Sequence, residues 1–488
     1  MKLRDLARGI PFGTMGVGLL FVAFALIAAL MPAQNDTFWH LRAGQDIWRT
    51  HTIPRIDLYS HTAAGAPWPD HEWLAQALIY GVYRVGGMPG LELGAAALVM
   101  GAATLTWRLM VGSLASRATV MTIGLAVSTC VWVLRPHLLT LFLLAVVLTL
   151  IARERWRWIP PLFLFWANAH GGVVLGGLVL ASAWAAAALR WWRVREAGDG
   201  ARLRALSIVL ALSGLACAAA PLGFGIYRFV IESTARSMQV KILEWFPVKP
   251  VDFFGVLFWA ATSGFVALLL VRGRRFFSRP APPWADWAIV AAAVAMLPLG
   301  ARSLRNTAPF ILLATPAASR LLGADFRLPA SIARWLRSRP RAASEDKPRL
   351  NLAILVAGAA TAVAVVAAQL ASPHPRLGWT PISEGALAAT RACSGPLYNQ
   401  YGDGGTLIWF VPEKPVFVDG RQDPFPLPFL LDAVEIEGGR KPYRPMFDRF
   451  GIQCAFLPSD AGTADQLLKD GWQPRFRDEK WIVLEAPR

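Results

Sequence analysis

The sequence predicts a polytopic α-helical membrane protein that ends in a small α/β domain, and three observations support this. Of the 488 residues, 55% are hydrophobic and only 17% are charged, a composition too apolar for a soluble enzyme. Apolar runs of about 16 to 21 residues recur within residues 1–371, and a helix needs about 20 such residues to cross a bilayer. Residues 372–488 have the composition of a soluble domain. We expect about 11 spans, some of them short or broken.

The net charge of +17 does not indicate a nucleic-acid partner. The basic residues lie in clusters beside the apolar runs, as membrane topology predicts, and no basic module with interleaved aromatic residues occurs. The four cysteines, Cys130, Cys217, Cys393 and Cys454, show no CxxC spacing. A zinc site or a redox motif is therefore not indicated.

The N-terminal segment sets the expected topology. Lys2, Arg4 and Arg8 precede the first apolar run, residues 12–31, and no clear cleavage site follows it. We interpret this run as an uncleaved anchor. The positive-inside rule then places the N-terminus in the cytoplasm and both the first loop, residues 33–73, and the C-terminus outside. Arginine clusters fall on the cytoplasmic side of the later spans, at 108–117, 153–157, 190–204, 272–275 and 320–349.

The other elements follow from the apolar runs and their breaks. Residues 74–88 predict an interfacial helix before a span at 89–107. Arg135, Pro136 and His137 form a turn between spans at 119–134 and 137–152. The run 159–189 is interrupted at 168–172, and such a break survives at membrane depth only where it lines protein or water. Further spans are expected at 205–220, 252–271, 285–301, 307–320 and 351–371, with an outer segment at 224–250 and an outer turn at 302–306.

The C-terminal region, residues 372–488, is expected to form an extracytoplasmic α/β sandwich with one core. Its β-like runs are 396–398, 416–419, 455–458 and 481–485, and residues 464–469 predict a helix. Cys393 and Cys454 each lie next to or at the start of a β-like run. In an oxidising compartment these two cysteines are candidates for a disulfide.

Residues that can do chemistry concentrate on the predicted outer side. Six of the seven histidines lie there: His40, His51, His61, His71, His137 and His170. The same side holds several acids and arginines, among them Asp36, Asp57, Glu72, Arg135, Arg302 and Arg305. Carboxylates act as general bases or metal ligands, and arginines bind phosphate bidentately.

Each of these residues also has a purely structural interpretation, and the sequence leaves both open. Asp36 could cap a helix that begins at Thr37, Asp57 could form a turn, and His170 could be a satisfied polar group at a helix break. The tryptophans and arginines could serve the membrane, as interface anchors or as side chains that reach the headgroups: Trp39, Trp68, Trp73, Arg135 and Arg305.

Several motifs together carry a family resemblance. The first outer loop holds Asp36-x-Phe38-Trp39-His40-Leu41-x-x-Gly44, Ile53-Pro54-x-x-Asp57-x-Tyr59-Ser60 and Trp68-x-x-His71-Glu72-Trp73-Leu74. Downstream are Arg135-Pro136, Trp166-x-Asn168-x-His170-Gly171, Arg305-Asn306, Gly404-Gly405-x-Leu407-Ile408-Trp409 and Val418-Asp419-Gly420-Arg421-x-Asp423. Most of the chain therefore resembles an uncharacterised bacterial subgroup of the GT-C glycosyltransferase superfamily, related to protein O-mannosyltransferases and aminoarabinose transferases.

The resemblance implies site residues. In the superfamily an acid early in the first outer loop is the catalytic base or a metal-bound acid, which corresponds here to Asp36. The better-known members often have a second acid directly beside it, where this chain has Thr37. The further catalytic candidates are Glu72, Asp57 and His71. The candidates for binding the donor and its phosphate are Arg135, His137, Asn168, His170, Arg302 and Arg305, and those for outer-loop substrate contacts are Trp39, His40 and Trp73.

The implied reaction moves a hexosyl or pentosyl group from a polyprenyl-phosphate donor to a lipid, glycan or protein acceptor, with inversion in one displacement. It would take place in the bacterial inner membrane, with the C-terminal domain in the periplasm. A divalent metal, Mg²⁺ or Mn²⁺, held by Asp36 with His71 or Glu72 is a further expectation.

Two other functions fit the sequence. One is a non-catalytic scaffold or polysaccharide-assembly partner whose outer domain binds glycan or protein, because a fold does not guarantee its chemistry. The other is a transporter, whose broken helices would resemble residues 168–172. The polar residues lie at the outer face rather than at the midplane, which disfavours the transporter.

Overall fold

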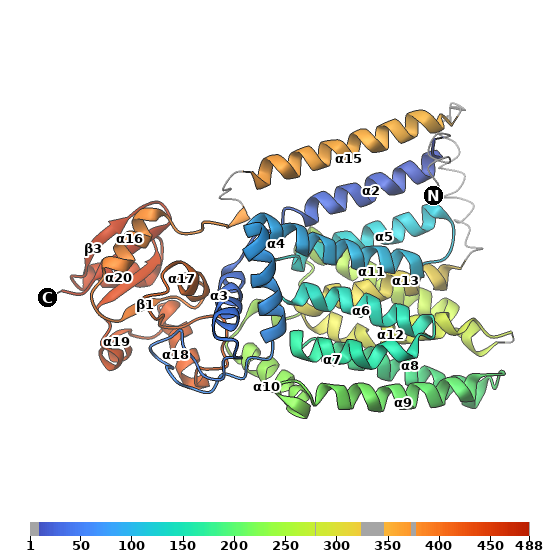
Figure 1. Ribbon diagram of the computed structural model, residues 1–488, viewed down its shortest axis with the longest axis horizontal. Helices are drawn as coiled ribbons and strands as arrows, with labels where there is room; N and C mark the ends of the chain where they lie inside the picture. Colours follow the sequence, from blue (N-terminus) through green and yellow to red (C-terminus); the bar gives the residue numbers. More distant parts are fainter. Residues whose placement is uncertain (1–8, 279, 324–345, 372–376, 488) are drawn as a thin grey trace.

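The computed structural model describes residues 9–278, 280–323, 346–371 and 377–487. Long helices lie side by side in one bundle, and the C-terminal domain packs against one end of it (Figure 1). We call this end of the bundle the domain end. Helix α3 and the first part of α4 lie there, between the bundle and the C-terminal domain (Figure 1).

A helix overlaps each predicted span. These helices are α2 (Phe12–Ala28), α4 (Trp73–Leu109), α5 (Leu114–Ser128), α6 (His137–Ala152), α7 (Ile159–Ala169), α8 (Val173–Arg193), α9 (Asp199–Cys217), α11 (Phe253–Arg272), α12 (Trp284–Arg302), α13 (Thr307–Leu322) and α15 (Pro348–Leu370). Within the described ranges, seven helices are long and apolar enough to cross a membrane, and α2 and α6 are shorter apolar helices. The prediction of a polytopic membrane protein with some short spans is confirmed.

Two predicted breaks are present. Helix α4 is interrupted at Gly87, whose φ of 59° and ψ of −154° are not helical, two residues before Pro89. This separates the predicted interfacial helix from the predicted span. Helix α7 ends at Ala169 and α8 begins at Val173, so the polar break at 168–172 is real.

The first outer stretch, residues 33–73, is not simply a loop, and this corrects the sequence interpretation. It contains a helix of 16 residues, α3 (Asn35–Thr50). Gln34 caps α3, and its side chain and that of Thr37 bond reciprocally to each other's backbone. The helix buries Phe38 and Leu41 while it carries acids and arginines elsewhere. Such an amphipathic segment has low average hydropathy, so it resembles a polar loop in sequence.

The outer segment 224–250 also contains an unpredicted helix, α10 (Ile226–Gln239). Three short 3₁₀ turns complete the domain end of the bundle: η1 (Thr129–Val131), η4 (Leu243–Trp245) and η6 (Leu304–Asn306). The turns η4 and η6 are joined because Leu304 donates its backbone N–H to the carbonyl of Phe246 at 2.9 Å.

The C-terminal domain is built on one sheet of four strands in the order β1-β2-β4-β3. The strands are β1 (Leu397–Asn399), β2 (Cys454–Pro458), β3 (Gln473–Arg477) and β4 (Trp481–Glu485), and only the β1–β2 pair is parallel. The helices around them are α16 (Glu384–Ala392), α17 (Gly404–Phe410), α18 (Leu427–Glu437), α19 (Arg444–Phe450) and α20 (Gly462–Lys469).

Sequence analysis located three of the four strands. The predicted run 416–419 is not a strand, since its pairing is a single bridge between Val416 and Ser60. Strand β3 was missed because it is mostly exposed and polar, as suits an edge strand. The predicted disulfide between Cys393 and Cys454 is confirmed, with 6.0 Å between the Cα atoms.

Both faces of the sheet are buried, in two different cores. Along β2, Ala455 and Leu457 face a core within the C-terminal domain, whereas Cys454 and Phe456 face a second core. The second core also contains Trp39 and Ala43 from α3 and Tyr59 and Trp68 from the following loop. The alternation follows the period of two along a strand. One hydrophobic core is therefore shared by the C-terminal domain and the first outer stretch.

A buried ion triad lies in the same interface. Arg421 of the C-terminal domain contacts Asp419 through Nε and Nη2, at 2.8 and 2.7 Å, and Asp57 of the outer stretch through Nη2 at 2.6 Å. All three side chains are 0% exposed. The guanidinium also stacks on Tyr59 and Trp68, at 4.9 and 4.7 Å from the ring centroids. Asp57 therefore joins the two parts of the chain and is not placed as a catalytic acid.

We expect Arg421→Met to destabilise the protein by about 3–5 kcal/mol, because it leaves two buried carboxylates without a cationic partner. Arg440→Met is the matched control, since Arg440 makes an exposed pair with Glu435 and should change stability little. Thermal unfolding of both variants measures this. Equal melting temperatures for the two variants would contradict the role given to the triad.

We also expect residues at the two ends of the bundle to lie on opposite sides of the membrane. Ala64, in the first outer stretch, and Ala197, between α8 and α9, are both exposed. Single cysteines at these positions, with Cys130 and Cys217 changed to serine, should react with a membrane-impermeant reagent from the outside at residue 64 only. Labelling of both from the same side would contradict this topology. The basic stretch 320–349 lies largely outside the described residues.

Candidate functional site

The candidate site lies at the domain end of the bundle, where Arg135 stands between two carboxylates. Its Nη2 contacts Oδ2 of Asp36 at 2.6 Å, and its Nη1 contacts Oε2 of Glu244 at 3.3 Å. Arg135 is placed by the Pro136 turn between η1 and α6. Burial opposes its charge, but Asp36 and Glu244 outweigh this and raise the pKa of Arg135.

A second arginine reaches the same glutamate. Nη1 of Arg305, in η6, contacts Oε1 of Glu244 at 2.7 Å, and the guanidinium lies 5.0 Å from the ring centroid of Trp245. Burial alone would raise the pKa of Glu244, yet Arg305 and Arg135 lower it to about 2. Asp36, Arg135, Glu244 and Arg305 thus form a continuous chain of alternating charge, which we call the charge chain.

Asp36 lies in the first turn of α3 and does not cap it, because Gln34 is the N-cap. The capping interpretation of Asp36 is therefore wrong. Its Oδ1 accepts a hydrogen bond from Nε1 of Trp39 at 3.2 Å. A Cβ atom at Gly420 of the C-terminal domain would lie 2.4 Å from the same oxygen, so only glycine lets the two parts of the chain approach so closely.

Glu72, just before α4, is surrounded by three histidines. Its Oε1 lies 3.2 Å from Nε2 of His170 and 3.7 Å from Nε2 of His71, and its Oε2 lies 3.7 Å from Nε2 of His40. Burial raises the pKa of Glu72 to about 7, despite the opposing charges of Arg305 and Arg135. Burial also lowers the pKa values of His40 and His71. At pH values high enough to ionise Glu72, these histidines are therefore neutral.

The hydrogen bonds of His170 fix which ring nitrogen carries its proton. The backbone N–H of Gly172 donates to Nδ1 at 2.8 Å, so Nδ1 has no proton and Nε2 carries it toward Glu72. Thr140 donates to Nδ1 at 2.8 Å and accepts from Nε1 of Trp166 at 3.0 Å. His170 thus satisfies the helix break and also faces the site.

Other predicted residues hold the frame of the site. Nε1 of Trp73 donates to Oδ1 of Asn168 at 3.0 Å, which ties the start of α4 to the end of α7. Nε2 of His137 donates to the carbonyl of Val131 at 2.6 Å and closes the turn before α6. Arg302 is exposed in the last turn of α12 and forms no ion pair with the described residues. The charge chain therefore contains Arg305 but not Arg302.

Trp39 and Trp68 are not membrane anchors, because both are buried in the core shared with the C-terminal domain. His40 is also buried and lies with its ring 3.6 Å from that of Trp39. Trp39 thus contacts Asp36 through its indole nitrogen, and His40 contacts Glu72 through its imidazole ring. Arg135 and Arg305 pair with Asp36 and Glu244, so both guanidinium groups are directed into the site.

Sequence reasoning missed Glu244 and the contribution of the C-terminal domain. Glu244 lies in an outer segment that carries several other charged residues, and no pattern in the sequence sets it apart. Tyr401 donates its hydroxyl to the carbonyl of Gly420 at 3.3 Å, and burial and then Asp36 raise its pKa. Burial raises the pKa of Asp423 to about 6, although His71 and Arg236 oppose this. The motif at residues 418–423 was recognised, but its place beside Asp36 was not.

The donor set does not fit a metal ion shared by Asp36 and His71. One oxygen of Asp36 contacts Arg135 and the other Trp39, while His71 faces Glu72. In the part of the chain that the structure describes, no group of three or more His, Cys, Asp or Glu side chains is arranged to hold a metal ion.

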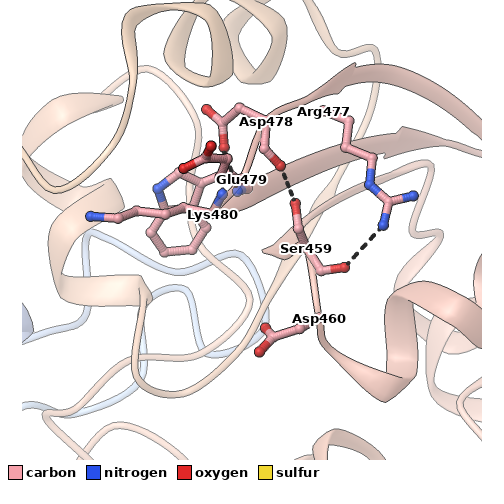
Figure 2. A pocket seen from close by; sticks show the side chains of 7 residues that line it. Ser459, Asp460, Arg477, Asp478, Glu479 and Lys480 are labelled. Carbon is pink, nitrogen blue, oxygen red and sulfur yellow. Dashed lines mark hydrogen bonds between the residues drawn. The ribbon is translucent and has the colours of Figure 1, made fainter.

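The C-terminal domain also has an open hollow of about 620 Å³ at the end of β2 and the β3–β4 turn (Figure 2). Its lining is charged and includes Asp460, Arg477 and Lys480. Ser459 donates its hydroxyl to the carbonyl of Asp478 at 2.8 Å and accepts at its own carbonyl from Arg477 at 3.4 Å. None of the predicted site residues lines this hollow, and we assign it no role.

No protein-family model and no curated protein sequence matches the chain. Solved structures do match it. ArnT from Cupriavidus metallidurans in the apo state has a TM-score of 0.52 and 16% identity, covering 97% of this chain and 100% of ArnT. The oligosaccharyltransferase AglB from Archaeoglobus fulgidus, in complex with an inhibitory peptide and a dolichol-phosphate, has a TM-score of 0.54 and 12% identity, covering 90% of this chain and 69% of AglB. Both are GT-C glycosyltransferases.

The chain has a GT-C fold. ArnT bound to undecaprenyl phosphate also matches, with a TM-score of 0.50, 16% identity and coverage of 96% of this chain and 99% of ArnT. At these identities the likeness establishes the GT-C fold and leaves the chemistry to the site residues. The fold class expected from the sequence is confirmed.

We expect Glu72→Gln to stabilise the protein more at pH 8 than at pH 5. Folding raises the pKa of Glu72 from 4.5 to about 7, so the folded protein binds this proton more tightly than the unfolded chain. Stability therefore falls as the pH rises from 4.5 to about 7, and glutamine removes that loss. Melting temperatures at the two pH values measure it. The control, Glu479→Gln at an exposed position, should show no such difference, and a pH-independent effect of Glu72→Gln would contradict the assignment.

Proposed function

We propose that the protein is a membrane glycosyltransferase that moves a sugar from a polyprenyl-phosphate donor to an acceptor hydroxyl by a single inverting displacement. The observation that carries this proposal is the convergence of Arg135 and Arg305 on one anionic group at the domain end. Guanidinium groups bind phosphate oxygens in the same way as carboxylate oxygens.

The arginines serve the leaving group. When the bond between the anomeric carbon and the phosphate oxygen breaks, the electron pair stays on that oxygen and negative charge develops there. Arg135 and Arg305 are fixed at this position before the reaction by Asp36 and Trp245. Preorganised charge of this kind typically contributes about 10²–10³ in rate per donor.

Asp36 is the best placed general base. Its side chain is 18% exposed, compared with 11% for Glu72, and it lies directly beside the phosphate-binding Arg135. A carboxylate here takes the proton of the acceptor hydroxyl as the oxygen attacks the face of the sugar opposite to the phosphate. One displacement inverts the anomeric centre.

The donor class draws support from the matched structures, since ArnT is bound to undecaprenyl phosphate and AglB to a dolichol-phosphate. The acceptor is a hydroxyl on a lipid, a glycan or a protein. The C-terminal domain covers Asp36 through Gly420 and Tyr401, so it is the part of the chain that meets the acceptor. We place the protein in a bacterial inner membrane with this domain in the periplasm.

We expect Asp36→Asn to lower the rate of sugar transfer by about 10²–10⁴ and to leave the melting temperature nearly unchanged. Asparagine keeps the size of the side chain and an oxygen for the Trp39 bond. Transfer from a polyprenyl-phosphate sugar by purified protein in nanodiscs measures this. Asp432→Asn is the control, because Asp432 forms an exposed pair with Lys441. Normal turnover by the Asp36→Asn protein would end the catalytic role of Asp36.

A further inference from the structure

Glu244 holds the position between Arg135 and Arg305 that the proposed function gives to the donor phosphate. We propose that the Glu244 carboxylate is a displaceable placeholder for that phosphate and so sets the affinity of the site for polyprenyl phosphates. The inference rests on the proposed function of the two arginines. It adds a residue that the catalytic scheme does not contain.

The geometry of Glu244 is that of a bridging anion. One carboxylate oxygen, Oε2, lies 3.3 Å from Nη1 of Arg135, and the other, Oε1, lies 2.7 Å from Nη1 of Arg305. Each guanidinium therefore contacts its own oxygen. Two oxygens of a phosphate group can make the same two contacts, so phosphate and carboxylate compete for them.

The arginines have other supports, so Glu244 can leave without loss of the site. Arg135 keeps its contact with Asp36 at 2.6 Å, and Arg305 keeps its stacking on Trp245 at 5.0 Å. The positive charges stay in place when the bridging carboxylate turns away.

Only the side chain of Glu244 has to move. Its backbone carbonyl accepts the hydroxyl of Ser303 at 3.1 Å, and the next turn is fixed by the bond between Leu304 and Phe246. The side chain is 27% exposed, so the displaced carboxylate can be solvated at once. Ionised at neutral pH, it can return when the phosphate departs.

This exchange has a consequence for turnover. The lipid product of sugar transfer is the polyprenyl phosphate itself, a phosphate monoester that carries more negative charge than the phosphodiester of the donor and therefore competes strongly for the two arginines. An internal anion that competes with it weakens product binding and speeds its release. Glu244 thus limits the affinity of the site in favour of turnover.

The test is binding of undecaprenyl phosphate to the full-length protein in nanodiscs, with wild type, Glu244→Gln and Glu232→Gln compared. Removing the competing charge should lower the Kd by about tenfold and slow dissociation by a similar factor. Glu232 is the matched control, because it pairs with Arg228 in the same outer segment and is 61% exposed. Its amide variant should bind like wild type.

An unchanged or higher Kd in a folded Glu244→Gln protein overturns the inference, because it would show that Glu244 only supports the arginines. Thermal unfolding reports the folded state. If the glutamine variant does not fold, Glu244→Asp carries the test. The shorter side chain cannot bridge both guanidiniums, so its Kd must fall below that of wild type, and a Kd equal to wild type overturns the inference.

Arg305→Gln in the wild-type background separates this inference from the function on which it rests. Weaker binding in Arg305→Gln together with an unchanged Kd in Glu244→Gln refutes the placeholder alone. Unchanged binding in Arg305→Gln and in Arg135→Gln refutes the phosphate site, and the placeholder with it.

Discussion

The contact between the C-terminal domain and helix α3 is the constraint on which the candidate site depends. It combines a shared hydrophobic core with the buried pairing of Arg421 to Asp57 and Asp419. A buried arginine with two acids adds little net stability, since the desolvation of three charges offsets most of their attraction. Its effect is geometric, because any slip of the domain would leave buried charges unpaired. The loop that follows Asp419 is thereby held against Asp36.

The charge chain also depends on the pairing of opposite charges, but its side chains are less buried than those of the Arg421 triad. Asp36 and Glu244 pair with Arg135 and Arg305, so acidic and basic side chains match in number within the charge chain. Glu72 lies in a different environment, among neutral histidines, and its proton is held near neutral pH. Beside this set of paired charges lie the carboxyl groups of Glu72 and Asp423, whose pKa values of about 7 and about 6 are close to neutral pH.

Much of this architecture is predictable from the sequence. Long apolar runs locate the helices because hydrocarbon accepts few polar residues, and Gly87 and His170 mark breaks that flanking glycine or proline makes visible. The expected outer location of the histidines follows from the arginine clusters. Helix α3 is less visible, since it buries one face against protein and keeps its average polarity. Its Asp36 was found by family resemblance rather than by pattern.

The pairings within the site could not be predicted. Asp36, Arg135, Glu244 and Arg305 come from four separate segments, and their distances depend on how the helices pack. For Asp57, in contrast, the sequence suggests a site residue where the structure shows a structural one. It stands in a motif beside other candidates, and only burial and the partner Arg421 reveal that it holds the domain in place.

The bond between Cys393 and Cys454 gives the chain a dependence on its cellular environment. It closes a loop of 61 residues that contains β1, α17 and the segment facing Asp36, and a cross-link of this length is worth about 4 kcal/mol in the chain-entropy model. Thiols stay reduced in the cytosol. In the proposed topology the C-terminal domain lies in an oxidising compartment where this cross-link forms, and a chain inserted in the opposite orientation would lack it. In that topology, correct insertion and completion of the site are coupled through one oxidation step.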